Sequence, residues 1–133
     1  GVSNFTADEL AVAREHLDAP IFANQVEYHP YFQTPDLLAE NRAHDERVVA
    51  YSPLAGGRLF DDPVLADIAE AHDATPAQVA LAWLCRMDGV VTIPKASSPE
   101  HQASNLAAAD LSLTDDDCER IEGLDRGLEL YPE

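Results

Sequence analysis

GVVTIPKASSP, residues 89–99, contains the pattern that decides the fold. Its first part, Gly89 to Ile93, is apolar and mostly β-branched, and it is too short for a helix. Pro94-Lys95 follow it, and Ser98-Pro99 then supply a helix cap with proline at the first helical position. The stretch is therefore a strand, a polar turn and a helix start, which is the repeating unit of an α/β fold.

The same pattern recurs earlier in the chain. Two further apolar runs, Ile21 to Val26 and Val48 to Tyr51, have the near-continuous hydrophobicity of strands covered on both faces, as in a parallel sheet. A strand end is expected at Gly1 to Ser3. Hydroxyl residues that cap helices stand between the runs, at Thr6, Thr34, Thr75, Ser98 and Thr114. The expected order is strand, helix, strand, helix, strand, helices, strand, helix, helix, with right-handed crossovers between parallel strands.

The charge of the chain restricts its partners. There are 25 Asp and Glu against 8 Lys and Arg, for a net charge of −17, and Lys95 is the only lysine. A polyanion such as nucleic acid or an anionic membrane would be repelled, so neither is expected as a partner. The hydrophobic content of 46% favours a folded chain over a disordered one. Excess carboxylates with almost no lysine predict a halophilic protein, and an acidic protein of ordinary salt stays open as the alternative.

Cysteine usage and the lack of targeting signals predict a cytoplasmic location. Cys85 and Cys118 fall in helical segments without disulfide-type or metal-type spacing, so we interpret both as reduced packing residues. No apolar run reaches about 18 residues, and no signal peptide is recognisable. The chain opens at Gly1 and its one methionine is Met87, so we expect it to be a piece of a longer protein.

Polar residues follow each predicted strand. They are Ser3-Asn4, then Gln25 and Glu27, then Tyr51-Ser52-Pro53, and finally Pro94-Lys95. The carboxyl ends of parallel strands share one edge of the sheet, and ligands of α/β folds bind there. A single polar turn would carry no meaning, because strand-to-helix turns are polar in general. Four such turns, one with the only lysine, favour a ligand site.

Lys95 precedes a helix start, where free backbone N–H groups and the helix dipole favour an anion such as phosphate. The net negative charge opposes this, but screening confines that repulsion to about 8 Å, whereas a charge-assisted contact contributes roughly 1.5–3 kcal/mol. His101 and Asn105 are four residues apart on one face of the same helix. His101 is either a further positive group at low pH or a solvated residue, and Asn105 either pairs with a base or is simply polar.

Five blocks of sequence resemble the aldo-keto reductase family, in order and over essentially the whole chain. They are GVSNF at 1–5, NQVEYHPY at 24–31, AYSPLAGG at 50–57, TPAQVALAWL at 75–84 and IPKASSPEHQASNL at 93–106. The resemblance implies a (β/α)8 TIM barrel that binds NADPH or NADH across the carboxyl ends of its strands. Such a barrel needs about 250 residues. We therefore expect residues 1–133 to be one partial domain, the C-terminal portion of an incomplete barrel.

The resemblance also implies a role for individual residues along an extended dinucleotide. The implied contacts are Ser3, Asn4 and Gln25 at the nicotinamide carboxamide, Tyr51 against the nicotinamide ring, Ser52, Leu54, Gly56 and Gly57 along the pyrophosphate, Lys95, Ser97 and Ser98 at the phosphate on the adenosine ribose, and Asn105 at the adenine.

Two positions depart from the NADPH-preferring members of the family. His101 stands where those members usually have arginine, and Ser104 where they often have glutamate. A planar guanidinium binds phosphate in a way that imidazole does not, which weakens the preference for NADPH. NADPH is still the expected cofactor because Lys95 is present, and NADH remains possible.

Family chemistry uses an Asp, Tyr, Lys and His tetrad that the resemblance places before Gly1. We therefore expect no catalytic residue in this chain and no activity from it alone. The expected function is that of an NAD(P)H-dependent reductase of aldehydes or ketones, here a fragment that carries most of the cofactor site and lacks the N-terminal half of the barrel. Two alternatives stay open: a non-catalytic half-barrel that binds pyridine nucleotide, and an inert fragment with exposed strand edges. The tail from Gly123 either shapes the substrate pocket or is disordered.

Overall fold

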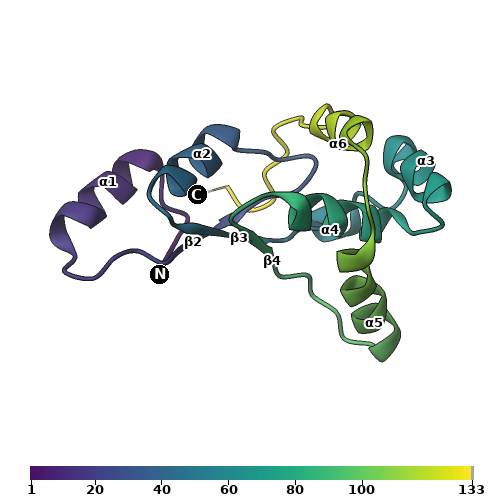
Figure 1. The fold of residues 1–133 in the computed structure, drawn as a ribbon, viewed down its shortest axis with the longest axis horizontal. Coiled ribbons are helices and arrows are strands. Elements are labelled where there is room, and N and C mark those ends of the chain that lie inside the picture. Colours follow the sequence, from purple (N-terminus) through teal and green to yellow (C-terminus); the bar gives the residue numbers. More distant parts are fainter. Residues whose placement is uncertain (133) are drawn as a thin grey trace.

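The computed structural model describes residues 1–132 as one parallel sheet flanked by helices (Figure 1). The strands are β1 (Val2–Ser3), β2 (Ala23–Glu27), β3 (Arg47–Tyr51) and β4 (Val90–Thr92). All three neighbouring pairs are parallel, and the order in the sheet is β1-β2-β3-β4. The predicted strands are confirmed with small shifts, since β2 begins two residues later than expected and includes Glu27.

The helices follow in the predicted order. They are α1 (Ala7–His16), α2 (Pro35–Ala43), α3 (Pro63–Ala71), α4 (Pro76–Arg86), α5 (Pro99–Ala107) and α6 (Asp115–Glu122), with short 3-10 turns η1 (Ala55–Gly57) and η2 (Ala108–Asp110). Each neighbouring pair of strands is joined by at least one helix, which is the arrangement that parallel strands require.

Most helix starts use the predicted hydroxyl caps. Complete capping boxes stand at Thr6, Thr75 and Thr114, and the Ser98 hydroxyl accepts a hydrogen bond from the His101 N–H. The prediction for Thr34 is wrong, because its side chain makes no capping bond and α2 relies on Pro35 at its first position. The cap of α3 was not anticipated: the Asp62 carboxylate accepts from the N–H groups of Val64 and Leu65.

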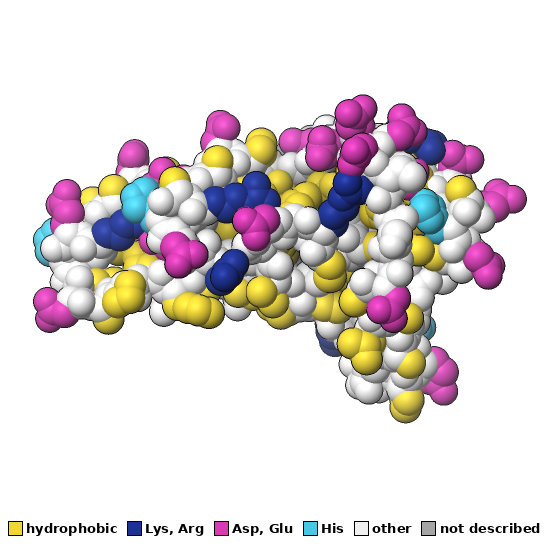
Figure 2. All heavy atoms as spheres, in the orientation of Figure 1, with side chains coloured by type: hydrophobic (Ala, Val, Ile, Leu, Met, Phe, Trp, Pro, Cys, Tyr) yellow, Lys and Arg dark blue, Asp and Glu magenta, His cyan; other side chains and the backbone are white. Residues whose placement is uncertain are grey.

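The sheet has one covered face and one largely bare face. Val48 and Ala50 are buried beneath the helices, with α2 packed on β3 and α4 on β4. Side chains at the alternate strand positions point to the opposite face of the sheet, where Val91 on β4 is 50% exposed. The expectation of strands covered on both faces is therefore wrong for residues 1–132, which supply a helix layer on one side only. Figure 2 shows carboxylates around the helical side and hydrophobic side chains along the lower side.

The core lies between the sheet and helices α3, α4 and α6. Every residue of α4 from Val79 to Leu84 is buried, and Leu65 and Ile121 pack against it from α3 and α6. The Trp83 ring lies 6.0 Å from the ring of Tyr28, centroid to centroid. Trp83 and Leu84 both belong to this core.

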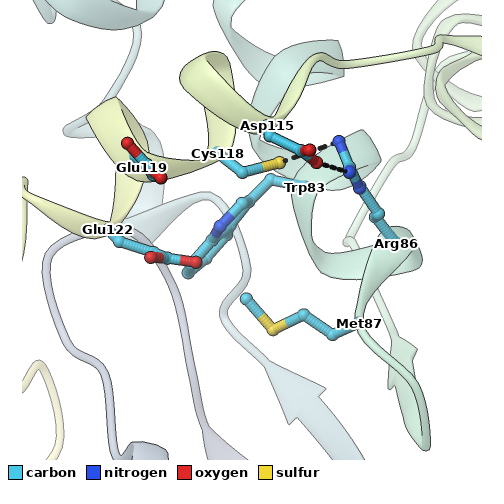
Figure 3. Close-up of a pocket in the computed structure, with 7 residues that line it drawn as sticks. All are labelled: Trp83, Arg86, Met87, Asp115, Cys118, Glu119 and Glu122. Carbon is cyan, nitrogen blue, oxygen red and sulfur yellow. Dashed lines mark hydrogen bonds and ion pairs between the residues drawn. The ribbon is translucent and has the colours of Figure 1, made fainter.

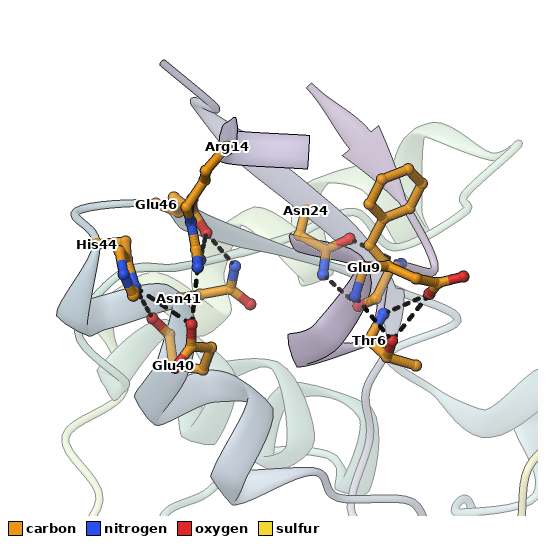
Figure 4. Close-up of polar contacts among 9 residues, drawn as sticks. Thr6, Glu9, Arg14, Asn24, Glu40, Asn41, His44 and Glu46 are labelled. Atoms are coloured by element: carbon orange, nitrogen blue, oxygen red, sulfur yellow. Dashed lines mark hydrogen bonds and ion pairs between the residues drawn. The ribbon is translucent and has the colours of Figure 1, made fainter. Parts of the chain in front are cut away.

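A polar network joins α1, α2 and β3 at the other end of the sheet (Figure 4). Glu46, just before β3, accepts hydrogen bonds from Arg14 Nε at 2.7 Å, Arg14 Nη2 at 2.9 Å and Asn41 Nδ2 at 2.7 Å. The buried Asn24 side chain bonds to both backbone groups of Phe5. Together these contacts fix the turn that follows β1.

The cysteines depart in part from the expectation. Cys118 is half-buried, but Cys85 is exposed and borders a hollow that residues of β4 and α5 also line. Neither cysteine is paired in a disulfide. Among the described residues, no helix has the length and apolar character needed to cross a membrane.

Candidate functional site

Polar residues from three strands meet at the carboxyl edge of the sheet. The Gln25 carbonyl accepts hydrogen bonds from the Asn4 N–H at 2.9 Å and from the Ser3 hydroxyl at 3.0 Å. Glu27 and Tyr51 are register partners on β2 and β3. The structure therefore brings Ser3, Asn4, Gln25 and Tyr51 together, as the sequence predicted for one shared edge.

A cavity of about 290 Å³ opens at this edge. Asn4 from the turn after β1 and Tyr51 from the end of β3 both line it, and Tyr131 from the C-terminal segment closes one side. Aromatic and amide groups in one hollow suit a flat, polar ring. Ser3, Gln25 and Ser52 lie close by without lining the cavity.

The backbone is strained where the predicted site residues lie. Asn4 has φ of 57° and Ser52 has φ of 49°, a left-handed conformation that non-glycine residues rarely adopt. Asp45 and Asp73, which follow α2 and α3, have a positive φ as well, so this conformation does not by itself mark the site. Gly56 and Gly57 have φ of 61° and 86°, so η1 itself requires glycine there. The backbone conformation therefore explains glycine at these two positions as well as the predicted contact with a pyrophosphate does.

A second cavity, of about 420 Å³, lies between the turn after β3 and the start of α5. Leu54, Lys95, His101 and Asn105 line it, together with the first turn of α4. Lys95 is exposed and forms no ion pair with any other residue in the described range 1–132. A free ammonium beside a helix start is therefore available to an anion.

The remaining predicted phosphate contacts take other positions. The Ser98 hydroxyl already accepts the His101 N–H as the cap of α5. Ser97 is exposed in the turn before α5. Ser97, Gly56 and Gly57 do not line the second cavity. Lys95, His101 and Asn105 therefore converge with Leu54, which was predicted at the pyrophosphate, and the other predicted phosphate contacts lie outside this cavity.

The loop of residues 51–57 connects the two cavities. Tyr51 lines the first cavity and Leu54, three residues later, lines the second. An elongated ligand along this loop would contact both. The pair of hollows therefore fits a molecule with a flat polar ring at one end and a phosphate near the other.

Glu27 and Tyr131 belong to this edge: Glu27 was named among the polar residues at the strand ends but given no role, and Tyr131 was missed. The buried Glu27 carboxylate accepts hydrogen bonds from His29 Nε2 and Leu130 N, both at 2.8 Å, and from Tyr131 N at 3.2 Å. The Tyr131 ring lies 6.0 Å from the Tyr51 ring. Glu27 shares a strand face with Gln25, which was a signal, but no sequence pattern indicated that the tail returns to this edge.

The His29 side chain has a structural role. Its ring is fully buried, and Nδ1 accepts a hydrogen bond from the Tyr31 N–H at 3.3 Å, which leaves Nε2 to donate to Glu27. Burial lowers the pKa of His29, against the opposing effect of Glu27, so the ring stays neutral near pH 7.

A third hollow, of about 410 Å³, lies between α4 and α6 (Figure 3). Arg86 there donates to the Leu113 carbonyl at 2.6 Å and pairs with Asp115, and burial raises the pKa of the nearby Cys118 thiol. The hollow lies where α4 ends, next to the amino end of β4, so it is remote from the strand edge that carries the other two. Within residues 1–132, no group of three His, Cys, Asp or Glu side chains is placed to hold a metal.

Comparison with known proteins identifies relatives of the whole chain. Residues 1–126 match the model of the aldo/keto reductase family. An aldo-keto reductase of Mycobacterium avium (strain 104) is 42% identical over 127 residues, which are 96% of this chain and 44% of that protein. The chain therefore spans less than half the length of this relative.

Solved structures give the same result. The crystal structure of a putative 2,5-diketo-D-gluconic acid reductase B matches all of this chain and 48% of its own, with a TM-score of 0.95 and 34% identity. An aldo-keto reductase crystallised in complex with NADPH has a TM-score of 0.90 and 27% identity over 99% of this chain and 43% of its own.

Proposed function

The chain belongs to the aldo/keto reductase family, and from this premise we propose that it forms the C-terminal part of an NAD(P)H-dependent reductase of aldehydes or ketones. The observation that carries the proposal is the pair of cavities along the 51–57 loop, with Asn4 and Tyr51 in one and Lys95 and Asn105 in the other. The NADPH found in a similar structure supports the choice of ligand.

At the first cavity, the chain would bind and orient the nicotinamide. The amides of Asn4 and Gln25 and the hydroxyl of Ser3 would pair with the carboxamide, and the Tyr51 ring would support the flat face. The reduced nicotinamide supplies a hydride to a carbonyl carbon when it is bound. A fixed ring orientation is the contribution of these residues, because hydride transfer depends on alignment.

At the second cavity, the chain would bind the adenosine end. Lys95 and the positive end of the α5 dipole would meet the phosphate on the adenosine ribose, while Ser98 caps the helix by accepting the His101 N–H. Asn105 would pair with the adenine, and His101 would stand beside the phosphate without the bidentate grip of an arginine. NADPH is the preferred cofactor on this proposal, with NADH as a weaker ligand.

The binding test is calorimetry of Lys95→Ala with both cofactors. A lost lysine–phosphate contact of roughly 1.5–3 kcal/mol lowers the affinity for NADPH by about 10- to 100-fold and leaves NADH nearly unchanged. Arg120→Ala is the matched control, since it removes one positive charge from an exposed pair with Asp67 on the helical side. Equal losses for NADPH and NADH would refute the assignment of Lys95.

The proton donor of the reaction lies outside residues 1–133 on this proposal. The chain alone should not oxidise NADPH in the presence of a simple aldehyde, whereas a protein that also contains the Asp, Tyr, Lys and His tetrad should. Measurable turnover by the chain alone would contradict the placement of the tetrad.

A second candidate function is a half-barrel that binds pyridine nucleotide without reducing a substrate, alone or paired with another half. The bare sheet face and the unpaired outer edges of β1 and β4 favour this candidate, because both need a partner to be covered. The coding sequence upstream of Gly1 separates the two. An in-frame tetrad supports the reductase, and its absence supports the nucleotide-binding half.

A further inference from the structure

The C-terminal segment returns from α6 to the carboxyl edge of the sheet, and we call residues 127–131 the strap. The N–H groups of Arg126 and Leu128 donate to the Tyr31 carbonyl at 3.2 Å and 2.9 Å. The Arg126 guanidinium lies 3.6 Å from the centroid of the Tyr31 ring. These contacts fix the start of the strap, which Figure 1 shows as the yellow segment approaching the strands.

Glu27 holds the far end of the strap. Its carboxylate is 3% exposed and accepts the N–H groups of both Leu130 and Tyr131, while His29 Nε2–H fixes its orientation. Hydrogen bonds from backbone N–H groups to a buried carboxylate are among the stronger ones in proteins. Glu27 is therefore a positioning residue for the strap.

The strap places the Tyr131 ring beside the Tyr51 ring, and both line the first cavity. The two ring centroids are 6.0 Å apart and the planes are tilted by 57°. A third ring stacked between them would need about 3.5 Å on each side, or roughly 7 Å in all. The present gap is too small, so a nicotinamide on this face of Tyr51 would have to displace the Tyr131 side chain.

We propose that the strap is an autoinhibitory contact: Tyr131, positioned by Glu27, occupies the ring face of Tyr51 that a nicotinamide would use. This proposal rests on the proposed function. The Tyr131 side chain is 58% exposed and lies at the end of the strap, so it can swing away while Glu27 keeps the backbone in place. Cofactor binding is then weakened by the cost of separating the two tyrosines.

The direct test compares two probes on the 133-residue chain by calorimetry. NADPH reaches both cavities, whereas adenosine 2′,5′-bisphosphate reaches only the Lys95 cavity. Tyr131→Ala should tighten NADPH binding about two- to twelve-fold, the range expected for one aromatic pair, and should leave the bisphosphate unchanged. Tyr131→Phe is the matched control, because it retains the ring and should behave like the parent chain.

The two probes separate the failure of this proposal from the failure of the proposed function. The autoinhibitory role of the strap alone is refuted if Lys95→Ala abolishes bisphosphate binding while Tyr131→Ala fails to tighten NADPH binding. No binding of either probe overturns the proposed function and the strap with it.

A second readout needs no cofactor. In Glu27→Gln, one acceptor oxygen becomes a donor; the oxygen that is kept can still accept from His29 and Leu130, so the amide of Tyr131, which bonds to the other oxygen, should exchange its hydrogen at least about tenfold faster. The Leu128 amide bonds to Tyr31 and should keep its protection, which makes it the internal control. Fast exchange at residues 130 and 131 in the parent chain would refute the role of Glu27.

Discussion

Replacing Glu46 by alanine should be among the most damaging single changes at the α1 end of the sheet. The carboxylate is 4% exposed and accepts two hydrogen bonds from Arg14 and one from Asn41. Asn41 is fully buried and its Oδ1 already lacks a partner, so Glu46→Ala would leave both ends of that amide unpaired. The Arg14 side chain is 21% exposed and can regain water in part.

The expected magnitude follows from these contacts. An unsatisfied buried amide costs about 1–3 kcal/mol, and loss of the charge-assisted Arg14 contacts adds roughly 1.5 kcal/mol once solvation of Arg14 is allowed for. The free energy of unfolding should fall by about 3 kcal/mol, which for a domain of this size lowers the melting temperature by roughly 10 °C. Urea unfolding at neutral pH, followed by circular dichroism, measures the free energy of unfolding.

Glu40→Ala is the matched control, because Glu40 also touches Arg14, at 2.8 Å, but its side chain is 31% exposed. Such a partly exposed pair should cost less than about 1 kcal/mol. The hydrogen bonds from Arg14, ahead of the opposing effect of burial, hold the pKa of Glu46 below its ordinary value. Its stabilisation is therefore present above that ordinary pKa and lost as the pH falls. Equal small losses in both variants would refute the reasoning.

Three further predictions concern charge. Burial alone would raise the pKa of Asp117, but hydrogen bonds from Thr114 and His72 lower it overall, so Asp117→Asn should cost about 1–2 kcal/mol at pH 7. This cost should shrink as the pH falls below the ordinary pKa of an aspartate, as urea unfolding at neutral and acid pH would show. Burial lowers the pKa of His29, so its imidazole should titrate below about 6.5 when followed by NMR. The part of the stability that depends on neutral His29 should be lost as the pH falls below about 6.5. A His29 pKa above about 6.5 would contradict the neutral tautomer assigned to the buried ring. With a net charge of −17, the melting temperature should rise by several degrees between roughly 0.1 M and about 3 M KCl, and an unchanged value would refute the halophilic interpretation.

Local rules predicted the elements of this fold because each signal acts within a few residues. A hydroxyl three residues before Glu9 or Gln78 satisfies the backbone of its own helix whatever the rest of the chain does. Short apolar runs such as Val48 to Tyr51 fit only strands for the same reason. Asp62 was missed as a cap because an acidic residue in an acidic loop is no signal by itself.

Long-range contacts were beyond such rules. Glu27 is buried only because residues more than a hundred positions later cover it, and nothing near Glu27 indicates that. Cys85 was predicted to be a packing residue because it falls in a helical segment, yet it is exposed at a hollow between α4 and α5. The convergence of Asn4 and Tyr51 was predictable, since the carboxyl ends of parallel strands share one edge. The position of Tyr131 beside Tyr51 was not predictable.

The most direct test of the central claim is an NMR titration of the isotopically labelled chain with NADPH. A dinucleotide bound along the 51–57 loop should shift the signals of Asn4, Tyr51, Lys95 and Asn105 together, with one dissociation constant for all four. Shifts confined to the hollow between α4 and α6, or to one of the two cavities, would contradict the claim that both bind a single molecule.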